Sequence, residues 1–208
     1  MSQEYNELST LELDALKEIG NIGSGNAATA LAQMLGAKVD MTVPRVSVLD
    51  LEDVPELIGG ADLPVVGIYL SASGSAPANI LFILSIEKAC LLIDMLTGKQ
   101  PGETTVNDLD EIGISALMEL GNIITASYLN ALSVFTSLDF RPSVPALGMD
   151  MAAAILDAIL AQFGAVADHI LVLETEFKKS GQDIIGHFFL LPEPGSLEVI
   201  LAALGVNI

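Results

Sequence analysis

The chain has 208 residues, of which 51% are hydrophobic, so it is long enough to bury a core without metal or disulfide. Only 8 lysines and arginines stand against 27 aspartates and glutamates, which gives a formal net charge of −19. This negative field repels nucleic-acid phosphates and anionic lipid, so we expect no nucleic-acid partner and no role at a membrane surface.

The cysteine content and the first residues favour a reducing compartment. The single cysteine, Cys90, lies in an apolar run at residues 89–93, so no disulfide can form within the chain. The first five residues carry neither a basic segment nor an apolar one, so we expect no signal peptide. We therefore expect a cytoplasmic protein.

The first half of the chain predicts a long helix, then a strand, a hairpin and a second helix. Ser9-Thr10-Leu11-Glu12 is a capping-box pattern that opens a helix running towards Gly36. Pro44 follows that helix, and residues 52–63 form a loop with at most one helical turn. The short strand, the two hairpin strands and the second helix are expected at residues 46–49, 65–71, 78–86 and 87–96.

The second half predicts the same order of elements. Its long helix starts near Asn107 or Asp108, and Pro145 precedes a short strand. The later elements are a helix, two hairpin strands and a last helix, expected at residues 152–163, 169–177, 183–191 and 197–204.

The two halves also match residue by residue. Residues 14–35, DALKEIGNIGSGNAATALAQML, align with residues 115–136, SALMELGNIITASYLNALSVFT, at an offset of 101. The same offset relates Val43-Pro44 to Val144-Pro145. A self-match of this length predicts the duplication of a unit of about 100 residues.

The duplication predicts the domain organisation. We expect one pseudo-two-fold α+β domain over residues 1–208, made of repeats at about 9–98 and 107–208 with a linker at 99–106. Antiparallel hairpins form its sheet, and the two long helices lie on its surface.

Each long helix carries a recurring set of polar residues on one face. At about 100° per residue, positions i, i+4 and i+7 share a face, while the intervening leucines and isoleucines point to the core. The set is Asp14, Glu18 and Asn21 in the first helix and Ser115, Glu119 and Asn122 in the second. Pro44 and Pro145 each follow the asparagine after 22 residues. A solvated helix face would explain a single set, but the set occurs twice in register.

A glycine precedes each asparagine, at Gly20 and Gly121. Glycine costs about 1 kcal/mol relative to alanine inside a helix, so its presence needs a reason. Either it lets a partner's backbone approach an exposed asparagine, or it lets the helix pack closely against the other half. The sequence leaves both explanations open.

The doubled motif resembles that of the CheC family of chemotaxis phosphatases, which includes CheX and the amino-terminal part of FliY. The resemblance covers essentially the whole chain, including both prolines and the segment LGMDMAAA at residues 147–154. It implies dephosphorylation of the response regulator CheY at its aspartyl phosphate. The implied catalytic pairs are Glu18 with Asn21 and Glu119 with Asn122. Asp14, Ser115, Pro44, Pro145, Gly20 and Gly121 would support the motif.

The chemistry of an acyl phosphate is compatible with this implication. The reaction needs a water held in line with the phosphorus, and an asparagine amide can orient one because it both donates and accepts hydrogen bonds. The resemblance implies that the glutamate pairs with a lysine of the regulator, which also supplies its own Mg²⁺. We therefore expect no metal or cofactor of the chain's own.

The resemblance also implies docking of the receptor deamidase CheD, for which Asp150 is the candidate residue. An ordinary solvated acid at a helix start would equally explain Asp150. The alternative to an enzyme is a binding module that holds phosphorylated CheY or regulates CheD without hydrolysis.

Three further patterns have simpler explanations. Residues 23–28 match a G-x-G-x-x-A nucleotide motif, but an amphipathic helix precedes them where a buried strand is required. His169 and His187 lie on separate predicted strands, so we expect no zinc site. Two stretches without charge, residues 19–37 and 120–138, contain regular polar residues and are expected to be core helices rather than membrane spans.

Overall fold

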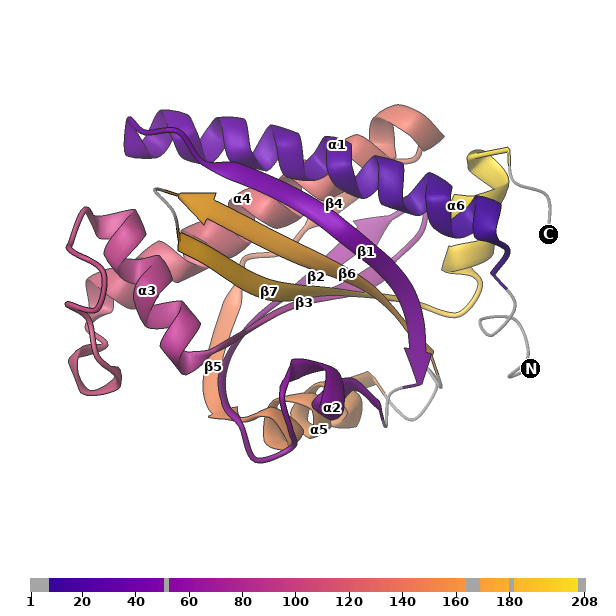
Figure 1. Cartoon of the computed structure of the whole chain (residues 1–208). Coiled ribbons are helices and arrows are strands. Elements are labelled where there is room, and N and C mark those ends of the chain that lie inside the picture. Colours follow the sequence, from indigo (N-terminus) through magenta and orange to yellow (C-terminus); the bar gives the residue numbers. More distant parts are fainter. Residues whose placement is uncertain (1–7, 51–52, 164–168, 180–181, 206–208) are drawn as a thin grey trace.

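A single antiparallel sheet with helices on both faces forms the protein (Figure 1). The computed structural model describes residues 8–50, 53–163, 169–179 and 182–205. The strands are β1 (Asp40–Asp50), β2 (Pro64–Gly74), β3 (Ala78–Ser85), β4 (Phe140–Pro142), β5 (Ala146–Met151), β6 (His169–Lys179) and β7 (Gln182–Pro192). The helices are α1 (Thr10–Leu35), α2 (Val54–Ile58), α3 (Ile86–Thr97), α4 (Glu111–Thr136), α5 (Ala152–Phe163) and α6 (Ser196–Ala203), with a short 3-10 helix at Val106–Asp108.

The sheet order exchanges the outer strands between the two halves. The order is β1-β6-β7-β3-β2, and β4 and β5 both pair with β2 at the far edge. β2–β3 and β6–β7 are the two hairpins, and β3 pairs with β7 at the centre. The first strand of each half therefore pairs with the hairpin of the other half: β1 with β6, and β4 and β5 with β2.

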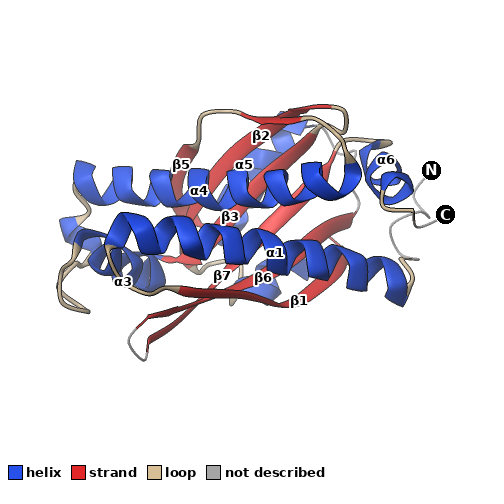
Figure 2. Cartoon of the chain, turned by 90° about the horizontal axis from the view of Figure 1, so that it is seen from above, coloured by secondary structure: helices blue, strands red, loops and turns tan. Residues whose placement is uncertain are grey.

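The two long helices lie side by side on one face of the sheet (Figure 2). Their inward residues, such as Leu16, Ile19, Leu117, Leu120 and Ile124, are buried in the larger hydrophobic core. α1 begins with a capping box, in which the Ser9 and Glu12 side chains bond each other's backbone N–H groups. α1 and α4 are thus core helices with one polar face each, as predicted.

The opposite face carries a second, smaller core. α2 and α5 cover it, and Val65, Ile83 and Val172 of the sheet are buried beneath them. Among the described residues, one helix, α4, is long and apolar enough to cross a membrane by length and composition. Its apolar side packs on the sheet and on α1, which is typical of the core helix of a globular domain.

The structure corrects three expectations about the elements. β1 extends over residues 40–50, far beyond the predicted 46–49, and it contains Pro44. α4 begins at Glu111 with Asp110 as its N-cap, because a 3-10 helix occupies the predicted start at 107 or 108. The short strand β4 was not predicted. The predicted end of α5 at Gly164 lies outside the described residues.

Candidate functional site

The polar residues of the first motif lie on the outer side of α1. Asp14 and Glu18 are exposed, and Asn21 is half-buried. In the described part of the chain, the Glu18 carboxylate forms neither an ion pair nor a hydrogen bond. The Asn21 side chain is held differently, because its Oδ1 accepts the backbone N–H of Val43 at 3.0 Å.

The second motif repeats this arrangement on α4. Ser115 and Glu119 are exposed, and Asn122 is half-buried. These three residues line an open groove of about 580 Å³ between α4 and the segment that joins β4 to β5. Apolar side chains and a second carboxylate complete the lining, and they include Glu111, Ile114, Met118, Pro142, Val144 and Pro145. The groove thus has an acidic wall and apolar walls, which suits a cationic side chain with an aliphatic stem.

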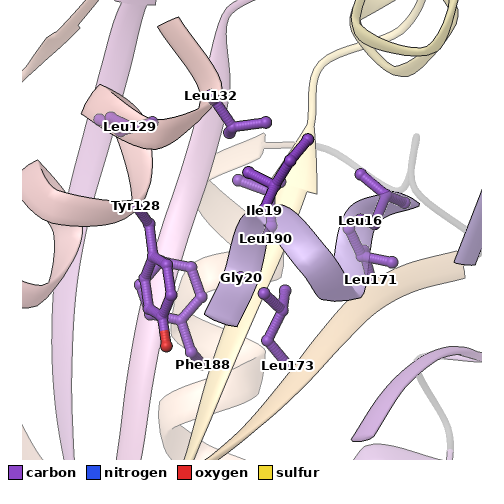
Figure 3. A pocket seen from close by; sticks show the side chains of 10 residues that line it. All are labelled: Leu16, Ile19, Gly20, Tyr128, Leu129, Leu132, Leu171, Leu173, Phe188 and Leu190. Carbon is purple, nitrogen blue, oxygen red and sulfur yellow. The ribbon is translucent and has the colours of Figure 1, made fainter. Parts of the chain in front are cut away.

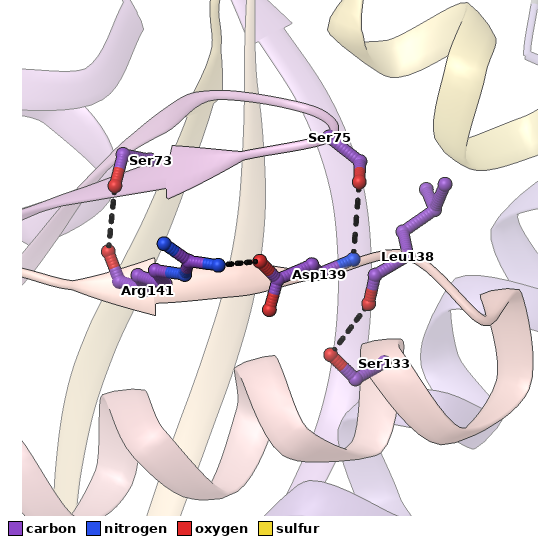
Figure 4. A network of polar contacts seen from close by, with 6 residues as sticks. All are labelled: Ser73, Ser75, Ser133, Leu138, Asp139 and Arg141. Atoms are coloured by element: carbon purple, nitrogen blue, oxygen red, sulfur yellow. Dashed lines mark hydrogen bonds and ion pairs between the residues drawn. The ribbon is translucent and has the colours of Figure 1, made fainter.

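β4 leads into the segment that forms one wall of the groove. Hydrogen bonds and an ion pair near the carboxyl end of α4 hold β4 in place (Figure 4). Ser75 Oγ accepts the Asp139 N–H, and the Ser73 hydroxyl donates to the Arg141 carbonyl. Arg141 pairs with Asp139 at 2.8 Å, but both side chains are largely exposed, so the ion pair adds little stability. Gly74 is required there, because its φ is 131° and an added Cβ would lie 2.1 Å from the Asp139 carbonyl oxygen.

A small internal cavity lies behind the first motif (Figure 3). Its volume is about 20 Å³, and its lining is apolar apart from the Tyr128 hydroxyl, which bonds Thr175. Burial raises the pKa of Tyr128 to about 12, so this hydroxyl stays neutral. A cavity of this size and lining has no room for a ligand larger than one water.

The glycines of both motifs serve packing of each helix against the sheet. Gly20 and Gly121 are buried, and an added Cβ would lie 3.0 Å from Cδ2 of Leu173 and 2.6 Å from Cγ2 of Ile68, respectively. Leu173 belongs to the second half and Ile68 to the first. The explanation by packing against the other half is therefore right, and approach by a partner's backbone is excluded at these buried positions.

The structure also corrects the expected place of one proline. Pro44 was expected to follow the first helix ahead of a strand at residues 46–49, but it lies inside the edge strand β1 at a bulge. Pro145 directly precedes the short strand β5, as expected, in the segment that joins β4 to β5. Thr42 pairs with Glu176 and Arg45 with Glu174, which leaves Val43 and Pro44 unpaired. In the second half, residues 143–145 lie between the Ala72–Pro142 pair and the Tyr69–Ala146 pair.

Comparisons with known proteins bear directly on the two motifs. The CheC-like family matches residues 11–48 and 112–149, which contain both motif helices and both prolines. The CheY-P phosphatase CheC of Bacillus subtilis is 36% identical, and the match covers 98% of this chain and 99% of that protein. The chain belongs to the CheC-like family.

One further relative supports the CheC-like assignment, and one solved structure shares the fold. The flagellar motor switch phosphatase FliY of Bacillus subtilis is 31% identical over 67% of this chain, which covers 36% of that longer protein. The crystal structure of Thermotoga maritima FliY has a TM-score of 0.77 and 23% identity, and the match covers 95% of this chain and 98% of that chain. The second likeness is one of fold.

Other residues of the CheC-like chain stand apart from the motifs. Asp150 lies in β5, two residues before α5 begins, and its exposed carboxylate accepts the Met151 N–H. Residues 23–28 lie in the middle of α1, whose N–H groups are used within the helix, so they form no phosphate-binding loop. No group of three or more potential metal ligands occurs within the described ranges.

Sequence reasoning missed two features of the motif faces. Leu11 and Ile112 are both 69% exposed, and they lie one turn before Asp14 and Ser115 at the same offset of 101. The equal offset of two exposed aliphatic residues could have identified them. The second missed feature is the hydrogen bond from the backbone N–H of Val43 to Asn21. Residue types could not have predicted it, because every residue except proline carries a backbone N–H.

Proposed function

We propose that the chain is a phosphatase of the chemotaxis regulator CheY, acting on its aspartyl phosphate. The observation that carries the proposal is the repeated face on α1 and α4. On each face an exposed glutamate without a partner in the described chain lies about one turn before a half-buried asparagine. The name of the Bacillus subtilis relative, a CheY-P phosphatase, supports the same substrate.

The proposed reaction is the attack of a water oxygen on the phosphorus of the acyl phosphate. The phosphorus–oxygen bond to the aspartate breaks, the carboxylate leaves, and inorganic phosphate forms. The amides of Asn21 and Asn122 orient that water, which lowers the barrier by removing its positional freedom. The regulator contributes its own Mg²⁺, and the chain contributes no metal.

The glutamates have a different role in this proposal. Glu18 and Glu119 are anions, so they cannot approach the phosphoryl oxygens closely without repulsion. A lysine next to the regulator's phosphorylation site forms an ion pair with each carboxylate. This ion pair fixes how far the asparagine reaches into the phosphorylation site. Asp14, Glu111 and the net charge of −19 add to the attraction for such a lysine.

A direct comparison of binding and hydrolysis tests the proposal. We would measure the decay of labelled phospho-CheY with increasing amounts of the chain, and the binding of phospho-CheY under the same conditions. Faster decay that saturates together with binding supports the phosphatase. Saturated binding with unchanged decay would make the chain a binding module and reject the enzyme.

CheD docking is a second, separate proposal that rests on β5. This strand is at the sheet edge, and Met149, Asp150 and Met151 are exposed along it. Two exposed methionines around a carboxylate favour a protein contact at this place. A pull-down of purified CheD that is unaffected by Asp150→Ala together with Met151→Ser would reject this site.

A further inference from the structure

The spacing between asparagine and proline connects the first motif helix to a bulge in the edge strand β1. In the first half, the bulge leaves Val43 and Pro44 without partners on β6. Pro44 has no N–H, so Val43 supplies the backbone donor nearest to the bulge. That donor bonds Asn21 Oδ1 at 3.0 Å, and the Val43 side chain is only 1% exposed.

This contact restricts the orientation of the Asn21 amide. The last torsion of an asparagine side chain is broad and roughly two-fold, so a free amide can exchange its oxygen and nitrogen positions. Only the oxygen can accept the Val43 N–H. The bond therefore fixes the oxygen against β1 and leaves the NH₂ group unbonded in the described chain.

We propose that the backbone N–H of Val43, presented by the Pro44 bulge, positions the Asn21 amide for the hydrolytic water. This inference rests on the proposed phosphatase function and names a positioning group for its first site. In the first half it also gives a physical reason for the Asn-x22-Pro spacing, because Pro44 follows directly after the donating residue.

The second half offers an internal comparison. Val144 corresponds to Val43, but it is 83% exposed, and in the described chain the Asn122 amide forms no hydrogen bond. The segment at residues 143–145 is tied to β2 instead, because Ser143 N–H donates to the Ser71 carbonyl at 2.7 Å and Ser143 Oγ accepts the Ser71 N–H at 3.0 Å. Removing the N–H of residue 144 should therefore matter less than removing that of residue 43.

The test uses the 208-residue chain with one of its two sites inactivated, so that the activity of the other site is measured alone. Asn122→Ala leaves the first site active, and Asn21→Ala leaves the second. Val43→Pro is added to the former and Val144→Pro to the latter, and kcat and KM are measured with labelled phospho-CheY. Because a small misplacement of a reacting group is costly, Val43→Pro should lower kcat on the order of tenfold to a hundredfold, with KM changed less than about twofold.

Two comparisons separate the N–H from the side chain. Val43→Ala keeps the N–H and should retain much more of kcat than Val43→Pro. Val144→Pro should lower kcat much less in its own background. Equal losses from Val43→Pro and Val43→Ala, or an effect on KM alone, would overturn the inference.

Amide hydrogen exchange keeps the inference testable if Val43→Pro does not fold. The Val43 amide should be protected in the wild-type chain and should lose protection in Asn21→Ala, while Val144 exchanges freely in both. A Val43 amide that exchanges equally fast in both proteins would overturn the inference, as would an inactive Asn122→Ala chain. Failure of the phosphatase proposal gives a different result. In that case the double variant Asn21→Ala/Asn122→Ala and the wild-type chain would show the same rate of phospho-CheY hydrolysis.

Discussion

Asn21 and Asn122 occupy equivalent positions in two copies of one motif, yet the protein holds them differently. The helix period was sufficient to place each with its glutamate on one face, because i and i+3 positions are neighbours on any α-helix. The bond from Val43 to Asn21 could not be predicted, since every residue except proline carries the same backbone donor. The bulge in β1 determines which backbone N–H is not paired with the neighbouring strand.

His187 gives a prediction at the residue scale. Burial lowers its pKa from 6.5, and the nearby Glu174 carboxylate opposes this shift only in part. The unfolded chain therefore binds a proton at a higher pH than the folded chain. As the pH falls through 6.5, this site should progressively lower the free energy of unfolding, whereas above 6.5 it should contribute nothing.

Urea unfolding between about pH 8 and about pH 5 measures this contribution. The wild-type chain and His187→Gln, which stays neutral throughout, should differ in slope, with the wild type losing more stability on acidification. Identical slopes would show that the buried imidazole is not destabilised by protonation.

At the scale of elements, sequence reasoning found the helices and hairpins because hydrophobic period and caps identify them locally. The Ser9 capping box and the glycine after α3 both lie where they were predicted. β1 was predicted too short because Pro44 was taken as its boundary. An edge strand tolerates a proline at a bulge, where no ladder hydrogen bond is lost.

The contact between α1 and α4 gives a prediction with a matched control. An added Cβ at Gly23 would lie 2.3 Å from Cδ1 and 3.0 Å from Cα of Tyr128, whereas nothing lies within 4 Å of one at Gly25. Gly23→Ala should lower the free energy of unfolding by about 1–3 kcal/mol through overpacking. Gly25→Ala, on the exposed side of the same helix, should raise it by about 0.5–1 kcal/mol.

Chemical denaturation of both variants measures the two effects. The opposite signs are the diagnostic result, because helix propensity alone would stabilise both. A stabilised Gly23→Ala chain would mean that the two long helices are not in close contact at this point.

At the scale of the whole molecule, the repeat was visible in the sequence but the exchange of outer strands was not. The alternation of apolar residues indicates which face of a strand is buried, and it carries no information about which strand lies beside it. The offset of 101 therefore predicted two similar units. It gave no sign that β1 would pair with β6 and β5 with β2.

This exchange predicts one cooperative unfolding transition for both halves. Each half lacks its own outer strand, so neither can lose its structure without disrupting the other. Fluorotyrosine NMR can follow Tyr69 on β2 and Tyr128 on α4 during urea unfolding. Both folded signals should disappear at the same urea midpoint, and separate midpoints would indicate two independently stable repeats.

The most direct measurement of the central claim is the decay of labelled phospho-CheY with the wild-type chain, Asn21→Ala, Asn122→Ala and the double variant. Both residues are half-buried at the surface, so circular dichroism should show folded proteins throughout. The account predicts that the wild type accelerates decay and that the double variant loses this acceleration on the order of a hundredfold. A folded double variant as active as the wild type would contradict the assignment of the two asparagines.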